Sequence, residues 1–230
     1  MIKDQIQLIL KSLTRKASRP SWVNLRSVHP ISRKFGVERG TPVDRYYIEK
    51  FLQEYQTLIQ HDIIEISENR YTRKFGSNIY HSFILDITPG PQITHVADLT
   101  KHASLPQGIA DCFICVQTLS FIYHIQEAVR GTYQILKPGG VLLATLPCIS
   151  HISRYDMERY GDYWRVTPLA AKKLFEDVFG KEHVVVHTYG NVLTAISFLE
   201  GITSEELSRE ELDENDEDYP LIIGVKAVKY

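Results

Sequence analysis

The segment between residues 148 and 165 concentrates side chains that could perform acid–base chemistry. His151 is the best proton acceptor in this segment, because an unperturbed histidine has a pKa of about 6.5. Asp156 is the second candidate base, and Tyr155 lies next to it in the sequence. We therefore expect His151, Asp156 and Tyr155 to be the catalytic residues. The same segment ends in aromatic and basic side chains that could surround a substrate: Tyr163, Trp164 and Arg165.

Trp164 and Arg165 also have a purely structural interpretation. Thr167 and Pro168 are typical of a helix start, with Thr167 at the N-cap and Pro168 at the first helical position. The two preceding residues could anchor that helix by packing and hydrogen bonding. The segment is nevertheless long for a connection between a strand and a helix, and long loops in compact domains tend to carry function.

The stretch from residue 109 to 147 must position this segment. Phe113–Val116 is a short apolar run of the kind found in buried parallel strands. A helical pattern of apolar residues follows over 125–136, and Lys137-Pro138-Gly139-Gly140 ends it because proline cannot continue a helix. Val141–Leu146 is a second apolar run. Such a strand–helix–strand unit predicts a right-handed crossover in a parallel sheet that is covered by helices on both faces.

Three blocks of this sequence carry a resemblance to a known family. They are Leu136-Lys137-Pro138-Gly139-Gly140, Gln117-Thr118-Leu119, and the block from Gly161 to Pro168. Together they resemble the class I S-adenosylmethionine (SAM)-dependent methyltransferases, in particular the small methyltransferase-11-like type associated with sugar and natural-product pathways. The resemblance implies a Rossmann-like sheet of seven strands in the order 3-2-1-4-5-7-6, with strand 7 antiparallel. It also implies SAM as cofactor and S-adenosylhomocysteine as product.

The resemblance further implies which residues hold the cofactor. The run Asp62–Ser67 is the predicted first strand, Glu65 occupies its acidic position, and Ser67 leads into the loop that follows. The predicted second, third and fourth strands are Tyr80–Ile87, Ile93–Ala97 and the run Phe113–Val116. Asp86, near the tip of the second strand, is the candidate for the ribose hydroxyls. The remaining candidates follow the third and fourth strands, where Asp98 and Leu99 suit adenine and Gln117 and Thr118 suit the methionine part. A turn-capping role for Asp86 and a helix-capping role for Asp98 are the alternatives.

The loop after the first strand departs from the family. Glycines are expected there because the cofactor lies close to the backbone, whereas this sequence has Ser67, Glu68 and Asn69. A carboxylate at Glu68 would repel the cofactor carboxylate unless it turns to solvent. Two functions are therefore open, namely a methyltransferase acting on a small-molecule hydroxyl or carboxylate, and an inactive methyltransferase-like binding or scaffold protein that has lost SAM. Chemistry other than methyl transfer on the same fold is a third alternative.

Residues 42–230 are expected to form the methyltransferase-like α/β domain, which begins with a helix. Thr41 suits its N-cap and Pro42 its first helical position. In the resembled family, helices before the first strand commonly cover the site, so Tyr46 is a candidate substrate-binding residue. Tyr123, near the start of the helix after the fourth strand, is another, although this region could equally be a polar surface.

Residues 1–41 are expected to form an amphipathic helix followed by a basic loop. The helix has an apolar stripe that includes Ile2, Ile6 and Leu13. It could dock on its own domain, on a partner such as a second copy in a homodimer, or weakly on anionic lipid, and docking on protein is the interpretation we favour.

Composition limits the remaining function classes. A net charge of -2 argues against a general nucleic-acid binder, and no apolar run reaches the roughly 18 residues of a membrane span. Cys112 and Cys115 are expected to pack in the core on opposite faces of one strand, and we expect no metal site. A cytoplasmic protein fits these features.

Overall fold

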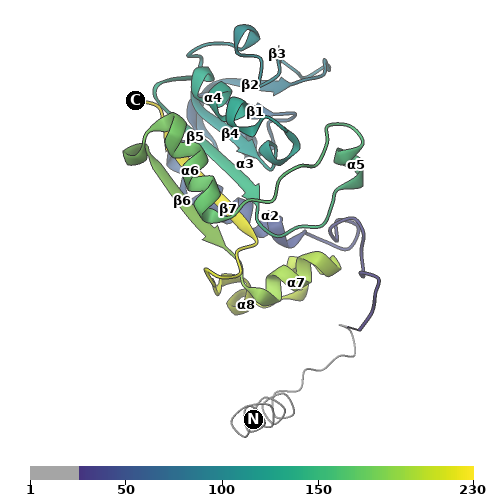
Figure 1. Cartoon of the computed structure of the whole chain (residues 1–230). Helices are drawn as coiled ribbons and strands as arrows, with labels where there is room; N and C mark the ends of the chain where they lie inside the picture. The colour runs from purple at the N-terminus through teal and green to yellow at the C-terminus, as the bar shows by residue number, and fades with distance from the viewer. Residues whose placement is uncertain (1–25) are drawn as a thin grey trace, which may run out of the picture. The chain divides into compact units, whose positions relative to one another are not determined.

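The computed structural model describes residues 26–230, of which residues 31–230 form one compact unit (Figure 1). The predicted amphipathic helix lies outside the described residues, so its structure and the expected dimer stay predictions. Among residues 26–230, no helix combines the length and the apolar character that crossing a membrane requires.

A seven-stranded sheet with the order β3-β2-β1-β4-β5-β7-β6 forms the centre of this unit. The pairs from β3 to β5 are parallel, whereas β7 runs antiparallel to both β5 and β6. The predicted order and the predicted antiparallel strand are therefore confirmed. The strands are β1 (Gln60–Ile66), β2 (Ser77–Asp86), β3 (His95–Val96), β4 (Ala110–Val116), β5 (Leu136–Pro147), β6 (Val184–Tyr189) and β7 (Ile222–Val228).

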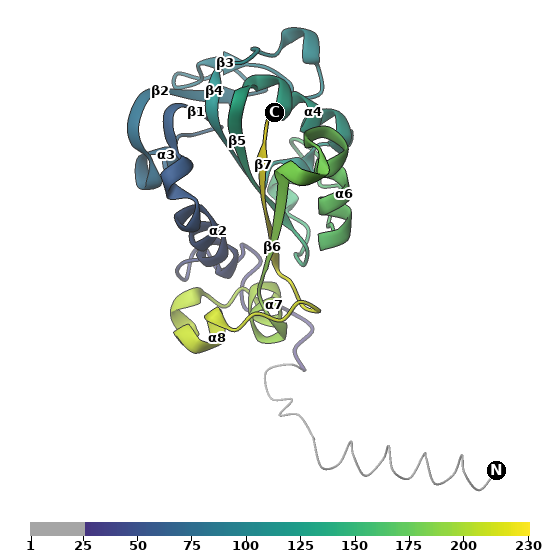
Figure 2. The ribbon, with the colours of Figure 1, turned by 90° about the vertical axis from the view of Figure 1, so that its left-hand side faces the viewer.

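Helices cover both faces of the sheet, as Figure 2 shows with the sheet seen nearly edge-on. On one face, α4 (Ile125–Ile135) and α6 (Pro168–Phe179) enclose a core that includes Phe113, Phe175 and Phe179. On the other face, α2 (Val43–Glu54) packs with α3 (Arg70–Phe75), α7 (Val192–Glu200) and α8 (Arg209–Asp213). A four-residue helix, α5 (Arg154–Met157), lies in the segment after β5. Both faces are buried, as expected for a sheet with parallel crossovers.

The central strand β4 shows how the alternation of side chains creates two cores. Successive residues of a strand point to opposite faces, so residues three apart also face opposite ways. Cys112 accordingly lies in the core beneath α2, and Cys115 lies in the core beneath α4. Both are free and fully buried, and desolvation raises the pKa of Cys115 to about 12. The predicted core packing of these two thiols is confirmed.

The start of α2 differs from the prediction by one residue. Pro42, not Thr41, is at the N-cap, and Val43 is the first helical residue. Thr41 is occupied elsewhere, because its N–H donates to both carboxylate oxygens of Glu205 at 3.1 and 3.0 Å. Pro42 also forms an isolated bridge with Thr203. This tie holds residues 31–41 against the turn that follows α7.

Candidate active site

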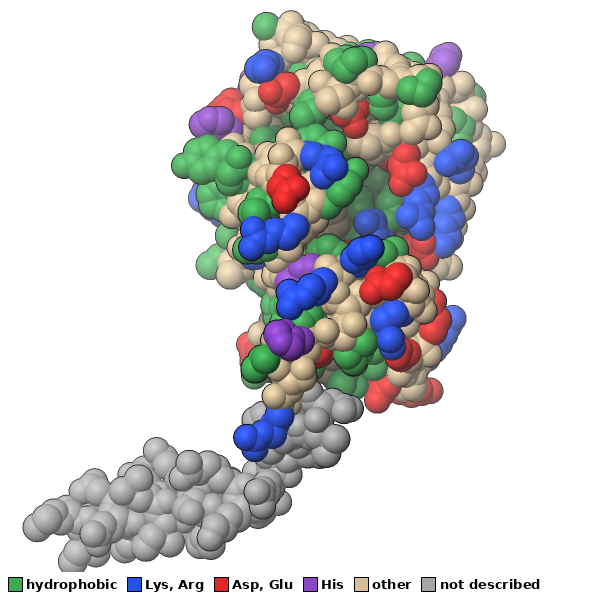
Figure 3. All heavy atoms as spheres, turned by 90° about the vertical axis from the view of Figure 1, so that its right-hand side faces the viewer, with side chains coloured by type: hydrophobic (Ala, Val, Ile, Leu, Met, Phe, Trp, Pro, Cys, Tyr) green, Lys and Arg blue, Asp and Glu red, His purple; other side chains and the backbone are tan. Residues whose placement is uncertain are grey.

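A large cavity opens at the carboxyl ends of the parallel strands. Its volume is about 1300 Å³, and its walls come from the tips of β1, β2, β4 and β5 together with residues 34–45 and 147–165. Ligands of open α/β sheets bind at this edge, in pockets of about 300–1,000 Å³ for one small molecule. Figure 3 shows a hollow on this side of the molecule with lysine and arginine side chains around it. The cavity is thus large enough for two ligands side by side.

The loop after β1 makes a tight turn although it lacks glycine. Ser67 has φ 63°, a left-handed conformation that non-glycine residues seldom adopt. The turn is closed by a hydrogen bond from the Glu68 N–H to the Ile66 carbonyl at 2.7 Å. The backbone at Ser67 therefore has a conformation that favours glycine, and Ser67 itself lines the cavity.

Glu65 is buried and uses both carboxylate oxygens within the protein. One oxygen accepts from the Tyr71 N–H at 3.0 Å, and the other accepts from the Thr72 N–H at 2.9 Å and the Thr72 hydroxyl at 2.8 Å. These N–H groups belong to the first turn of α3, so Glu65 caps that helix. Burial raises the pKa of Glu65 despite these hydrogen bonds. In this structure Glu65 positions the loop, and its predicted cofactor contact stays a prediction.

Asp86 and Ser67 meet across the tips of β2 and β1. The Ser67 hydroxyl donates to one Asp86 oxygen at 2.6 Å, and the Thr88 N–H and hydroxyl both donate to the other at 2.8 Å. Although burial opposes ionisation, the hydrogen bonds from Ser67 and Thr88 lower the pKa of Asp86. Both predicted residues line the cavity, and the turn-capping bonds that we considered for Asp86 are also present.

Asp98 and Leu99 line the cavity beyond Asp86. Asp98 Oδ1 accepts from the Thr100 N–H at 2.9 Å and from the Thr100 hydroxyl at 2.7 Å. Burial opposes ionisation here too, but the bonds from Thr100 lower the pKa of Asp98. The carboxylate is therefore ionised and oriented at neutral pH. Its second oxygen forms a 3.4 Å ion pair with Lys101 and has no other polar partner among residues 26–230.

Gly131 supports this part of the site, and sequence reasoning missed it. It lies within α4, where a Cβ atom would approach the Leu99 carbonyl oxygen to 2.1 Å. Only glycine lets the helix and the Leu99 backbone come so close. The signal was a lone glycine inside a predicted helix, which costs helix stability and so suggests a packing reason, but it does not identify the partner.

Gln117 leaves a polar group without a partner at the tip of β4. Its backbone has φ 51°, and its N–H donates to the Thr145 carbonyl at 3.0 Å. The side-chain Nε2 is buried and has no hydrogen-bond partner among the described residues. Thr118, the next predicted residue, instead donates its hydroxyl to the Val116 carbonyl at 3.0 Å. Gln117 is thus the residue here with a donor to offer a ligand.

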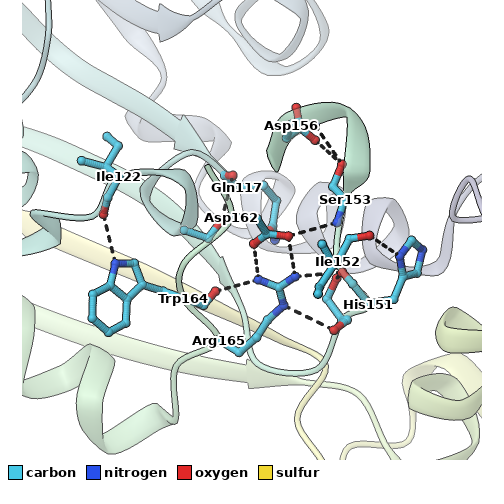
Figure 4. A network of polar contacts seen from close by, with 11 residues as sticks. Gln117, Ile122, His151, Ile152, Ser153, Asp156, Asp162, Trp164 and Arg165 are labelled. Carbon is cyan, nitrogen blue, oxygen red and sulfur yellow. Dashed lines mark hydrogen bonds and ion pairs between the residues drawn. The ribbon is translucent and has the colours of Figure 1, made fainter. Parts of the chain in front are cut away.

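The segment after β5 is held by an ion pair between Asp162 and Arg165 (Figure 4). The pair is bidentate, at 2.6 and 3.0 Å, and Arg165 also donates to the His151 carbonyl at 2.8 Å. Although burial opposes ionisation, Arg165 lowers the pKa of Asp162. Trp164 donates its Nε1–H to the Ile122 carbonyl at 3.0 Å. Both side chains make the anchoring contacts of the structural alternative, while Arg165 also lines the cavity.

Of the predicted catalytic residues, His151 and Asp156 line the cavity and Tyr155 does not. The His151 ring stacks on Phe35 with centroids 3.8 Å apart, and its Nδ1 lies 2.9 Å from the Ile152 carbonyl. Its Nε2 is buried without a partner among residues 26–230. Asp156 accepts from the Ser153 hydroxyl at 2.5 Å. Sequence reasoning did not identify Phe35, an aromatic side chain in a basic loop.

The predicted substrate-binding residues divide into two groups. Tyr123 and Tyr163 line the cavity in an edge-to-face pair with centroids 5.4 Å apart. Tyr46 lies away from it, because its hydroxyl donates to Asp213 at 2.8 Å. Trp164 lies behind Tyr123, with the two ring centroids 6.1 Å apart. Tyr46 and Trp164 are therefore not brought to the cavity wall.

The unsatisfied and acidic groups of this cavity fit an adenosine ligand with an amino-acid tail. Asp86 and Asp98 are acceptors for hydroxyl and amino groups, and Gln117 Nε2 is a donor without a partner in residues 26–230. Within the described part of the chain, no cluster of three or more His, Cys, Asp or Glu side chains is placed to hold a metal ion.

Comparisons with known proteins agree with this geometry. Residues 49–144 match the model of a family described as "Methyltransferase domain". No curated protein sequence matches the chain. Similar solved structures include an S-adenosylmethionine-dependent methyltransferase from Mesorhizobium loti, with 19% identity, TM-score 0.51, and coverage of 81% of this chain and 98% of that one.

Two further structures have the same fold. The N-methyltransferase NodS from Bradyrhizobium japonicum, in complex with S-adenosyl-l-homocysteine, has 12% identity, TM-score 0.50, and coverage of 87% of this chain and 94% of that one. A SAM-dependent methyltransferase from Archaeoglobus fulgidus has 16% identity, TM-score 0.50, and coverage of 80% and 94% respectively. The chain thus has the fold of the SAM-dependent methyltransferases, and its residues 49–144 match a methyltransferase domain.

Proposed function

We propose that this protein is a SAM-dependent methyltransferase that acts on a hydroxyl or carboxylate of a small molecule, such as a sugar-bearing or secondary metabolite. The observation that carries the proposal is the row of oriented carboxylates and the unused amide donor along one wall of the cavity. They are Asp98, Asp86 and Gln117, which follow three neighbouring strands.

Each of these side chains has a defined task in binding. Asp98 accepts from the exocyclic amino group of adenine, and Leu99 offers an apolar contact and its N–H. Asp86 accepts from the ribose hydroxyls, which take the place of the Ser67 hydroxyl. Gln117 donates its free amide to the amino-acid part. In support, bonds from Ser67, Thr88 and Thr100 orient the two carboxylates, and Gln117 Nε2 has no partner among the described residues.

When bound, SAM supplies an electrophilic methyl group, and the chain's remaining task is to orient the acceptor and take its proton. His151 lines the cavity, and its buried Nε2 has no partner within residues 26–230, so this nitrogen is the one that can accept a proton from an acceptor hydroxyl. The stack on Phe35 and the contact of Nδ1 with the Ile152 carbonyl fix the ring for this role. Tyr123 and Tyr163 provide aromatic surface for the acceptor.

Calorimetric titration with SAM and S-adenosylhomocysteine tests the proposal. We expect micromolar binding, weakened by about 1–3 kcal/mol in Asp98→Ala, the usual cost of losing a buried hydrogen-bond partner. Asp177→Ala, which changes an exposed aspartate on α6, serves as the matched control and keeps the affinity. No binding at millimolar ligand would overturn the proposal.

The role of His151 has its own test. Acceptors are first identified by transfer of radiolabelled methyl groups from SAM to a panel of hydroxylated small molecules. His151→Asn is then expected to lower turnover about 10²-fold or more while leaving the S-adenosylhomocysteine affinity unchanged. Normal turnover would exclude His151 as the base.

A second candidate function is a methyltransferase-like binding or scaffold protein without SAM. The observation in its favour is the Ser67 hydroxyl bonded to Asp86, where ribose hydroxyls are expected. The same titration distinguishes the two functions, because this candidate predicts no heat and no thermal shift with either ligand.

A further inference from the structure

Asp44 lines the cavity and carries a carboxylate oxygen that is unsatisfied among the described residues. It lies in the first turn of α2 and lines the cavity near the loop after β1. Its Oδ1 is buried and has no hydrogen-bond partner among the described residues. A buried carboxylate oxygen without a donor is costly and rare in native proteins, so it calls for a missing partner. A cationic group with N–H donors is the partner that such an oxygen fits best.

Arg45, the next residue, presents the opposite charge to the same cavity. Its Nη1 donates to the Tyr71 hydroxyl at 2.8 Å, which is the only side-chain hydrogen bond of Arg45 within residues 26–230. Tyr71 is itself 4% exposed, and its N–H is bonded to Glu65, so the guanidinium rests on a fixed support. A guanidinium has five N–H donors in a planar fork that matches a carboxylate. Arg45 therefore keeps donors available for an anion.

The two glutamates at the neighbouring loop do not suit the α-carboxylate of a SAM-like ligand. Both carboxylate oxygens of Glu65 accept hydrogen bonds from N–H groups of α3, and Glu68 adds a negative charge beside the cavity. Burial lowers the pKa of Arg45, whereas the charge of Asp44, the Tyr71 hydroxyl and, least, the charge of Glu68 raise it. The positive charge of Arg45 therefore acts on both carboxylates. An anion can therefore approach this loop despite Glu68.

We propose that Asp44 binds the α-ammonium group and Arg45 the α-carboxylate of the cofactor's amino-acid part. The inference rests on the proposed function, since it assumes a SAM-type ligand. Residues 44 and 45 precede the matched residues 49–144, so this recognition is contributed from outside the matched methyltransferase domain. The helix before the first strand thus replaces contacts that a glycine-rich loop would supply.

Two ligands that differ only in the amino-acid part test this inference by calorimetry. S-adenosylhomocysteine contains this part, whereas 5′-methylthioadenosine lacks it. We expect Asp44→Asn and Arg45→Met each to weaken S-adenosylhomocysteine binding by about tenfold or more, as for loss of a charge-assisted hydrogen bond. Binding of 5′-methylthioadenosine should stay within about twofold of the unmodified protein, because the ligand makes neither contact.

Control variants separate failure of this inference from failure of the proposed function. Asp98→Ala should weaken both ligands, and the exposed Asp177→Asn neither. If S-adenosylhomocysteine binds but Asp44→Asn and Arg45→Met leave its affinity unchanged, or weaken both ligands equally, the inference is wrong and the proposed function stands. If neither ligand binds the unmodified protein, both proposals fail. Thermal melts of the free variants verify that each is folded, and Arg45→Gln, which also removes the charge, replaces Arg45→Met if the latter is not.

Discussion

Substitution of Gly131 by alanine tests how the fold holds the adenine end of the site. Alanine is normally favourable in a helix, by about 1 kcal/mol relative to glycine. Here the new Cβ atom would lie 2.1 Å from the Leu99 carbonyl oxygen and 2.9 Å from a Leu105 methyl group, where real Cβ atoms essentially never come closer than 3.0 Å. The Leu99 backbone must therefore retreat by nearly 1 Å, the difference between these distances.

Neither neighbour has room for that retreat, because Leu99 and Leu105 are 3% and 5% exposed. Overpacking of a core costs about 1–3 kcal/mol, and we place this site at the upper end because backbone must move. After subtracting the helix gain, Gly131→Ala should lose about 2 kcal/mol of unfolding free energy. For a chain of this size the melting temperature falls by about 4–8 °C.

Urea unfolding followed by circular dichroism measures the loss, and titration with S-adenosylhomocysteine measures the effect on the site. Affinity should fall because the Asp98–Leu99 backbone moves. Gly108→Ala is the matched control: it also adds a methyl group, but into open space, so only its φ of +59° is strained. A Gly131→Ala protein as stable as the unmodified one, with unchanged affinity, would refute this reasoning.

Two further predictions concern the cavity loop and pH. Ser67→Gly should leave the free energy of unfolding nearly unchanged, since relief of the positive φ offsets the lost bond to Asp86. It should tighten S-adenosylhomocysteine binding by about fivefold, or roughly 1 kcal/mol, because the ribose no longer displaces a hydroxyl. Weaker binding of S-adenosylhomocysteine to the variant would contradict this prediction. Hydrogen bonds from the side chain and N–H of Thr41 lower the pKa of Glu205 from 4.5 to about 2. The stability that this exposed carboxylate contributes, about 1 kcal/mol or less, is present above pH 4.5 and is lost as the pH falls toward 2. The difference in urea unfolding between the unmodified protein and Glu205→Gln should shrink from pH 6 to pH 3, and a constant difference would disprove the effect.

The sequence predicted the sheet because apolar runs and helix signals repeat along the chain at the spacing of strand–helix units. Its order and its antiparallel seventh strand came from the resemblance, whose blocks lie near β4 and β5. Side-chain direction was harder to predict. Tyr46 was expected at the cavity, but a residue on α2 can face either way, and the hydroxyl bond to Asp213 turns it outward.

Contacts between segments that are far apart in the chain could not be predicted from the sequence. Nothing in a local pattern indicates that Phe35 stacks on His151, or that Gly131 meets Leu99. The turn at Ser67 shows a related limit. The residue type argued against a glycine-like backbone, yet the hydrogen bonds around the turn impose one.

The two buried cysteines of β4, Cys112 and Cys115, can report on opening of the sheet. A thiol-reactive dye can modify Cys112 and Cys115 only when the middle of the sheet becomes accessible, whereas the half-buried Cys148 is removed from the assay as Cys148→Ser. The labelling rate in native buffer then measures how often β4 opens spontaneously. A ligand resting on the tips of the adjoining strands would slow that rate in proportion to its occupancy, so its binding can be followed even before any methyl acceptor is known.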